Sequence, residues 1–123
     1  MKVRNVASSA VVAVGPAQSL REAAQLMAKH RVGSAVVQNA EQLVGILTER
    51  DVLGAVASAN DPETVSVEQI MTADVVTVGP DWDLIEAARV MARRRIRHLV
   101  VYDGGQLLGV LSVRDVLPAV LPE

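Results

Sequence analysis

The sequence predicts an α+β protein made of two tandem β-α-β-β-α repeats, and two observations carry this prediction. The first is an internal duplication: moving the chain by 64 positions aligns residues 11–56 with residues 75–120 without a gap, and 24 of the 46 aligned pairs are identical. The second is that each copy combines a helix-type apolar pattern with short strand-type apolar runs. Each copy is too small to bury a core well by itself, so we expect the two copies to form one module.

A long amphipathic helix is expected early in each repeat. Ser19 and Asp83 are N-cap residues that stand three positions before Glu22 and Glu86. This is the spacing of a capping box, in which the two side chains satisfy backbone N–H groups at the start of a helix. Apolar residues follow at helical spacing, at Leu20, Ala23, Ala24 and Met27 in the first repeat and at Leu84, Ala87, Ala88 and Met91 in the second.

Three strands and a second helix complete each repeat. A short strand precedes each Gly-Pro turn, and two further apolar runs separated by polar turn residues predict a hairpin. A final apolar helix follows, and Pro118 should shorten its second copy. The strands are expected at residues 11–14, 35–37 and 43–47 and at 75–78, 99–101 and 107–111, and the final helices at 52–57 and 116–120.

The boundary between the repeats is expected at a short linker. Residues 58–62 are polar or small and end in a proline, which is typical of a connecting segment. We therefore assign the first repeat to residues 1–60 and the second to residues 61–123. A brief helix at residues 66–71 is expected to have its equivalent at residues 2–7.

Composition excludes several classes of protein. With 50% hydrophobic and 21% charged residues the chain is globular, and no apolar run approaches the length of about 18 residues that a membrane span needs. A net charge of −2, with one Trp, one Tyr and no Phe, argues against nucleic-acid binding. The absence of Cys excludes disulfides and thiolate chemistry and favours a cytoplasmic location. The sequence has no evident cluster of metal-ligating residues. It also lacks the nucleophile signature and the Walker-type loop that would predict catalysis.

The motifs resemble those of a known family. Gly45 to Asp51 and Gly109 to Asp115 both follow the pattern Gly-h-h-Thr/Ser-x-x-Asp, where h is apolar, and the run from Ile96 to Asp103 completes the likeness. In the order of its elements and in these motifs the chain resembles a tandem pair of cystathionine-β-synthase (CBS) domains over nearly its full length. The resemblance implies a regulatory module whose repeats pack through their sheets with pseudo-twofold symmetry. It also implies clefts between the repeats that bind AMP, ADP, ATP, NAD or S-adenosylmethionine, without a required cofactor.

The resemblance assigns residues to two such clefts. Asp115 and, less firmly, Asp51 would accept hydrogen bonds from the ribose hydroxyls, and basic side chains would meet phosphate. Adenine would lie against the first strand of the opposite repeat, where backbone amides read its edge. The main cleft would then consist of Asp115, Ser112, Arg97, His98, Arg114, Ala13 and Val14, and the second of Asp51, Thr48, Arg50, Thr77 and Val78.

Several of these residues have a structural alternative. Thr48 and Ser112 each stand three residues before an aspartate, and capping of the following helix is favoured over ligand contact for both hydroxyls. Arg50 and Arg114 would equally suit solvated positions on their helices. We expect the clefts to be unequal, because Gly33 and Ser34 stand in the first repeat where the second has Arg97 and His98. Neither Gly33 nor Ser34 supplies a charge for phosphate.

Two further features flank the long helix that is expected in the second repeat. Arg93, Arg94 and Arg95 form a basic patch together with Arg97. The patch is interpreted first as a solvated helix end whose cations complement the helix dipole, with phosphate capture or an acidic partner as the alternatives. Trp82 precedes the helix and is interpreted as a hydrophobic staple rather than a ligand contact.

The leading hypothesis is a sensor module that binds an adenine nucleotide and acts on a separate partner protein. The alternative is a ligand-independent dimerising scaffold. Apolar residues lie around more than one stripe of the helices, for example at Ile85 and Leu117, so we expect a homodimer in either case.

Overall fold

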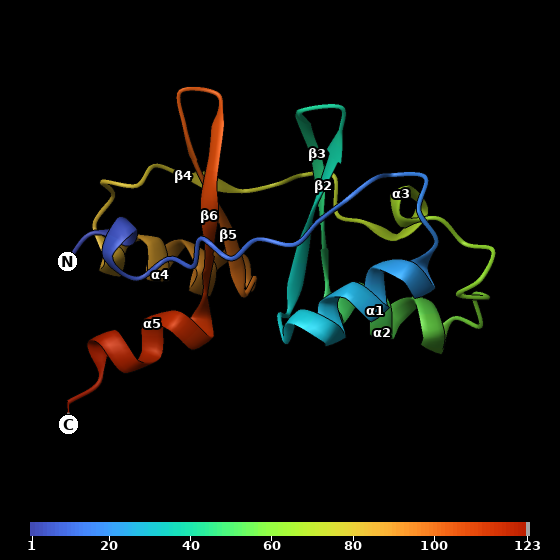
Figure 1. Ribbon diagram of the computed structural model, residues 1–123. Helices are drawn as coiled ribbons and strands as arrows, with labels where there is room; N and C mark the ends of the chain where they lie inside the picture. The colour runs from blue at the N-terminus through green and yellow to red at the C-terminus, as the bar shows by residue number, and fades with distance from the viewer. Residues whose placement is uncertain (123) are drawn as a thin grey trace. The chain divides into compact units, whose positions relative to one another are not determined.

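The computed structural model describes residues 1–122, which form two compact units (Figure 1). The first-repeat unit consists of Val12–Val75. The second-repeat unit combines Met1–Val11 with the described chain from Val76 onward. The compact units therefore do not coincide with the sequence repeats 1–60 and 61–123, because each repeat is completed by the segment that precedes the other one.

Each unit has the β-α-β-β-α order, so the predicted α+β repeat is confirmed. The first-repeat unit contains β1 (Ala13–Val14), α1 (Leu20–His30), β2 (Ser34–Asn39), β3 (Gln42–Thr48), α2 (Glu49–Ala57) and α3 (Val67–Ile70). The second-repeat unit contains the 3-10 helix η1 (Val3–Asn5), β4 (Thr77–Val78), α4 (Leu84–Arg94), β5 (His98–Asp103), β6 (Gln106–Ser112) and α5 (Val113–Val120). No helix within residues 1–122 has both the length and the apolarity needed to cross a bilayer.

Each unit contains one three-stranded mixed sheet. The strand orders are β1-β2-β3 and β4-β5-β6, with the short first strand parallel to the second and the hairpin strands antiparallel. The first strands are two residues long rather than the predicted four. Val11 and Val75 leave the sheet because their N–H groups bond instead to the carbonyls of Ser9 and Ala73 in local turns.

The predicted starts of the two long helices are confirmed. The two final helices begin earlier than predicted. Ser19 and Asp83 cap α1 and α4 by accepting hydrogen bonds from the N–H groups of Glu22 and Glu86. Helices α2 and α5 begin three residues before the predicted positions, since their capping residues already fix the first turn. Pro118 lies inside α5, which ends at Val120 as predicted, and α5 has 8 residues where α2 has 9.

The segment before each repeat completes the hydrophobic core of the other. Val3 is fully buried in the second-repeat unit, where it packs with Leu84, Leu99 and Leu111. Val67, its equivalent 64 positions later, is fully buried among the core residues of the first-repeat unit. Burial of such a side chain stabilises the fold by about 1.5–3 kcal/mol, so these two valines hold the preceding segments in place.

The glycine of each motif makes room for one of these segments. Ser8 exchanges two backbone hydrogen bonds of 3.0 Å with Val110, and Thr72 does the same with Ile46 at 2.9 Å. A Cβ atom on the neighbouring Gly109 would overlap the carbonyl oxygen of Ser8. The motif glycine is therefore required by the close approach of backbone, whatever the function of the motif.

The first hairpin turn contains a residue in a strained conformation. Ala40 has a φ of 56°, in the left-handed region, where the other hairpin has Gly104 with the same φ. A left-handed conformation costs a non-glycine residue about 1 kcal/mol. We expect Ala40→Gly to raise the free energy of unfolding by about 0.5–1 kcal/mol in chemical denaturation, since part of the relief is offset by the added freedom of the unfolded chain. Gly104→Ala is the matched reversal and should be destabilising; an Ala40→Gly variant less stable than the parent would contradict this account.

Candidate functional site

Asp115 lies at the start of α5, where it forms a capping box with Ser112. The Ser112 hydroxyl accepts a hydrogen bond of 3.1 Å from the N–H of Asp115. Asp115 Oδ2 in turn accepts from the Ser112 N–H at 3.2 Å and from its hydroxyl at 2.9 Å. The capping interpretation of Ser112 is thus confirmed, and the same bonds hold the Asp115 carboxylate in a fixed orientation.

The second carboxylate oxygen of Asp115 is not used by the fold. Among residues 1–122, no hydrogen bond reaches Asp115 Oδ1, and the side chain is half-buried. A carboxylate oxygen in this state accepts hydrogen bonds from neutral hydroxyls, and such bonds to a charged acceptor are stronger than neutral ones. The geometry therefore leaves Asp115 with one oxygen for a hydroxyl-bearing ligand.

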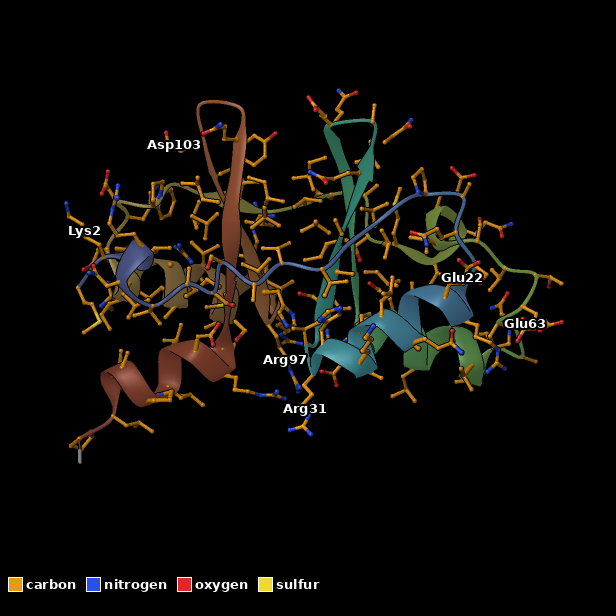
Figure 2. The ribbon with its side chains drawn as sticks, in the orientation of Figure 1. Lys2, Glu22, Arg31, Glu63, Arg97 and Asp103 are labelled. Carbon is orange, nitrogen blue, oxygen red and sulfur yellow. The ribbon has the colours of Figure 1, made fainter. Side chains whose placement is uncertain are left out.

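Arg97 and His98 are brought to the same end of the hairpin as Ser112. His98 pairs with Ser112 across the β5–β6 ladder, and the Arg97 carbonyl accepts a hydrogen bond of 3.0 Å from the N–H of Val113. Figure 2 shows Arg97 at the opposite end of the hairpin from Asp103. A guanidinium, an imidazole, a carboxylate and the N-terminus of α5 are thus gathered at one end of the second-repeat unit.

The equivalent carboxylate of the first-repeat unit is more fully occupied. Asp51 forms the same capping box with Thr48, whose N–H donates to Asp51 Oδ2 at 2.9 Å. In addition, the Thr72 hydroxyl lies 3.3 Å from Oδ1 and 3.4 Å from Oδ2 of Asp51. Ser8, the equivalent of Thr72, instead accepts a hydrogen bond from the N–H of Ala10. The two motif aspartates therefore differ in the described structure, although their sequences match.

The first-repeat unit also has no basic residue at the start of β2, where Gly33 and Ser34 stand at the positions equivalent to Arg97 and His98. Gly33 accepts a hydrogen bond from the N–H of Glu49, and Ser34 pairs with Thr48 and is buried. Arg50 in α2 and Arg114 in α5 each stand two positions after the capping residue, and both side chains are exposed.

The residues predicted to contact adenine lie on the short edge strands. Ala13 and Thr77 are exposed, whereas Val14 and Val78 are buried, so the last two have only backbone groups to offer a ligand. Ala13 and Val14 belong to the first-repeat unit and Asp115 to the second, and their assignment to one site stays a prediction.

A cavity of about 510 Å³ opens beside β4 in the second-repeat unit. Its lining residues are Val76, Thr77, Val78, Trp82, Val90, Arg93 and Arg94. Thr77 and Val78 belong to a predicted ligand site, whereas Trp82 does not. The Trp82 ring packs on Gly79 and forms part of the cavity wall. Neither Arg93 nor Arg94 forms an ion pair with any residue in the range 1–122. The cavity therefore combines an aromatic wall with two cations, a composition suited to an aromatic anion.

A comparison of the repeats contains the signal that would have found this cavity. Trp82, Arg93 and Arg94 stand opposite Gln18, Lys29 and His30, so the duplication has diverged at each of these lining positions. Within residues 1–122, no group of three or more His, Asp or Glu side chains is placed to hold a metal ion.

Comparison with known proteins agrees with the repeat pattern. The family model described as "CBS domain" matches residues 3–58 and 67–122. The CBS domain-containing protein YhcV of Bacillus subtilis is 34% identical over 114 residues, which cover 92% of this chain and 81% of that protein.

Two similar solved structures contain adenosine compounds. The CBS domain protein PAE2072 of Pyrobaculum aerophilum, solved in complex with AMP, is 34% identical with a TM-score of 0.85, covering 94% of this chain and 89% of that one. The CBS domain pair of the protein MJ0100, solved with methylthioadenosine and S-adenosylmethionine, is 25% identical with a TM-score of 0.89, covering 97% of this chain and 98% of that one.

Proposed function

The chain belongs to the family of CBS-domain proteins, and we propose that it is a regulatory module that binds an adenine nucleotide, AMP, ADP or ATP, at its Asp115 site. The observation that carries the proposal is the gathering of Arg97, His98 and Asp115 at one end of the β5–β6 hairpin. A nucleotide needs a hydroxyl acceptor and a phosphate-binding group within its own length, and these residues supply both kinds of group. The AMP bound by a relative of 34% identity supports the same ligand class.

Each group has a distinct part in this proposal. Asp115 Oδ1 accepts hydrogen bonds from the ribose hydroxyls, while Ser112 holds the carboxylate through Oδ2. Arg97 and His98 bind phosphate, with Arg114 as a further cation on the first turn of α5. The N-terminus of α5 adds the positive end of its dipole, which also favours phosphate. Ala13 and Val14 read the adenine edge through their backbone groups.

The second predicted site is proposed as the weaker one. Thr72 already occupies the Asp51 carboxylate, and the strand entry at Gly33 and Ser34 has no charge for phosphate. Thr48 and Arg50 complete this site, and Thr77 and Val78 read its adenine at the edge of the Trp82 cavity. Unequal affinities at the two sites follow from these differences.

Regulation rather than catalysis is the proposed outcome of binding. A ligand shifts a conformational equilibrium only when it binds one arrangement more tightly than another. Ligand binding by this module is therefore proposed to change its contacts with a separate partner protein.

Thermal unfolding with a panel of adenosine compounds tests the ligand class. AMP, ADP, ATP, 2′-deoxy-AMP, NAD and S-adenosylmethionine are each compared at matched concentration. A ligand present at 100 times its dissociation constant stabilises the folded state by about 2.7 kcal/mol, which is a readily measured rise in the unfolding temperature. We expect AMP, ADP or ATP to give the largest rise and 2′-deoxy-AMP a smaller one, because it lacks a hydroxyl for Asp115. Equal shifts for AMP and 2′-deoxy-AMP would contradict the role of the carboxylate, and S-adenosylmethionine as the best ligand would contradict that of phosphate.

The dimerising scaffold is the second candidate, and the exposed apolar residues of the final helices favour it. Leu53 on α2 and Leu117 on α5 occupy equivalent positions and are 69% and 48% exposed. Identical apolar residues exposed in both repeats suit burial against a second chain. We expect the protein to sediment as a homodimer, and Leu53→Glu to shift it toward the monomer without unfolding it. Gln25→Glu on α1 is the control for an added charge on the same unit; a wild-type monomer would contradict the proposed dimer.

A further inference from the structure

The turn that carries Trp82 is held by the N-terminal segment of the chain. The Val3 N–H donates to the carbonyl of Trp82, and the Arg4 N–H donates to that of Pro80, each at 2.9 Å. The two acceptor residues flank Asp81, so the N-terminal 3-10 helix η1 is hydrogen-bonded to the turn on both sides of that residue. The Trp82 ring is part of the cavity wall, so η1 is linked to this wall through the turn.

Side-chain contacts add an ionic clamp at the same place. Arg4 Nε donates to Asp81 Oδ1 at 2.8 Å, and Lys2 Nζ lies 3.5 Å from the same oxygen. Figure 2 shows Lys2 beside the N-terminal turn. The hydrogen bond from Arg4 lowers the pKa of Asp81, and the positive charges of Arg4 and Lys2 act in the same direction. Asp81 is therefore ionised at neutral pH, where the clamp is complete.

The other repeat has the same backbone contacts without the clamp. The Val67 and Glu68 N–H groups donate to the carbonyls of Gln18 and Pro16, at 2.8 and 2.9 Å, as Val3 and Arg4 do in the second-repeat unit. At the clamp positions, however, Glu68 replaces Arg4 and Ala17 replaces Asp81, so no ion pair can form.

The reason for the difference lies in the residue at position 82. Gln18, its equivalent, folds back so that its Oε1 accepts a hydrogen bond of 2.8 Å from the N–H of Gly15, which fixes the turn from within. An indole side chain has a donor but no acceptor, so Trp82 cannot make this bond to Gly79. The Trp82 turn keeps the backbone bond from the Trp82 N–H to the Gly79 carbonyl, at 3.3 Å, but has no side-chain bond like that of Gln18. Of the two turns, it is the one with the ionic clamp.

We infer that Arg4 and Lys2 are positioning residues for Trp82: by holding Asp81 they fix the indole ring as the wall of the cavity beside β4. The inference rests on the proposed function in one respect, that the cavity receives the adenine end of the nucleotide at the weaker, second site, to which Thr77 and Val78 are assigned. Arg4 and Lys2 do not line the cavity and act through Asp81 alone.

Trp82 is the only tryptophan of the chain, so its fluorescence reports on the turn directly. The test compares acrylamide quenching of Trp82, without ligand, in the wild type, Arg4→Ala, Asp81→Asn and Arg4→Lys. Arg89→Ala is the matched control, because it removes another exposed ion pair, that with Glu86, from the same unit. The affinity of each variant for AMP is then measured by calorimetry, and unfolding temperatures show that all variants are folded.

We expect Arg4→Ala and Asp81→Asn to change the quenching constant. We also expect both to weaken AMP binding at the second site by about two- to fivefold, the size that an exposed ion pair supports. Arg4→Lys, which keeps the charge, and Arg89→Ala should stay near the wild type in both measurements. Unchanged quenching in folded Arg4→Ala overturns the positioning role. Changed quenching with unchanged AMP affinity overturns its link to the ligand. A wild type that binds no AMP counts against the proposed function instead, and the quenching series still decides whether the clamp fixes Trp82.

Discussion

Gly109→Ala is expected to lower the free energy of unfolding by about 3 kcal/mol, at the upper end of the usual cost of overpacking a filled site. A Cβ atom at this position would overlap the Ser8 carbonyl oxygen and lie 3.2 Å from its carbonyl carbon. Backbone atoms cannot rotate away, so the N-terminal segment must move and both hydrogen bonds between Ser8 and Val110 weaken. Chemical denaturation followed by circular dichroism measures this loss.

The duplication supplies a matched control for this substitution. At Gly45 the nearest atoms to an added Cβ belong to the Met71 side chain, with Sδ at 2.5 Å and Cγ at 3.0 Å, followed by the Thr72 carbonyl oxygen at 3.1 Å. A methionine side chain is flexible and adapts to a new neighbour, so Gly45→Ala should cost less, about 1–2 kcal/mol. Equal losses for the two variants would show that close backbone approach does not explain the motif glycine.

Asp115→Asn is expected to weaken AMP binding by about 30-fold, since loss of hydrogen bonds to a charged group costs about 2 kcal/mol. Asparagine keeps the volume of the side chain and one acceptor for the Ser112 N–H, so α5 should remain capped. Calorimetric titration of the variant with AMP measures the effect, and its unfolding temperature checks that the fold is intact.

Asp51→Asn is the control from the equivalent capping box. Because Asp51 is already bonded to Thr72 and has no basic strand entry beside it, we expect it to change AMP affinity by less than about threefold. A larger effect at Asp51 than at Asp115 would reverse the assignment of the stronger site.

Much of the fold could be predicted because its signals are local. The caps at Ser19 and Asp83, the helical spacing behind them and the paired apolar runs of each hairpin depend on neighbours in sequence, and the duplication confirmed each signal with a second copy. The capping roles of Thr48 and Ser112 were predictable for the same reason.

The exchange of segments between the repeats could not be predicted in this way. Val3 and Val67 are equally apolar, and nothing local in the sequence states which core each one enters. The difference between Asp51 and Asp115 was hidden likewise, because it depends on Thr72, a residue 21 positions away from Asp51 in sequence. Pairing between distant segments is set by the tertiary structure alone.

The Trp82 cavity falls between these two cases. A hydrophobic staple involves only Trp82 and the helix that follows it. The cavity wall also includes residues of β4 and of the far end of α4. Its members could have been suspected from the divergence of the repeats, but their meeting at one place required the fold.

Calorimetric titration of the unmodified protein with AMP tests the central proposal most directly. The proposal predicts saturable binding of at least one AMP per chain, with the affinity of the tighter site lowered about 30-fold in Asp115→Asn. No saturable heat from AMP, ADP or ATP in protein shown to be folded would contradict it, and would leave the dimerising scaffold as the better account of this chain.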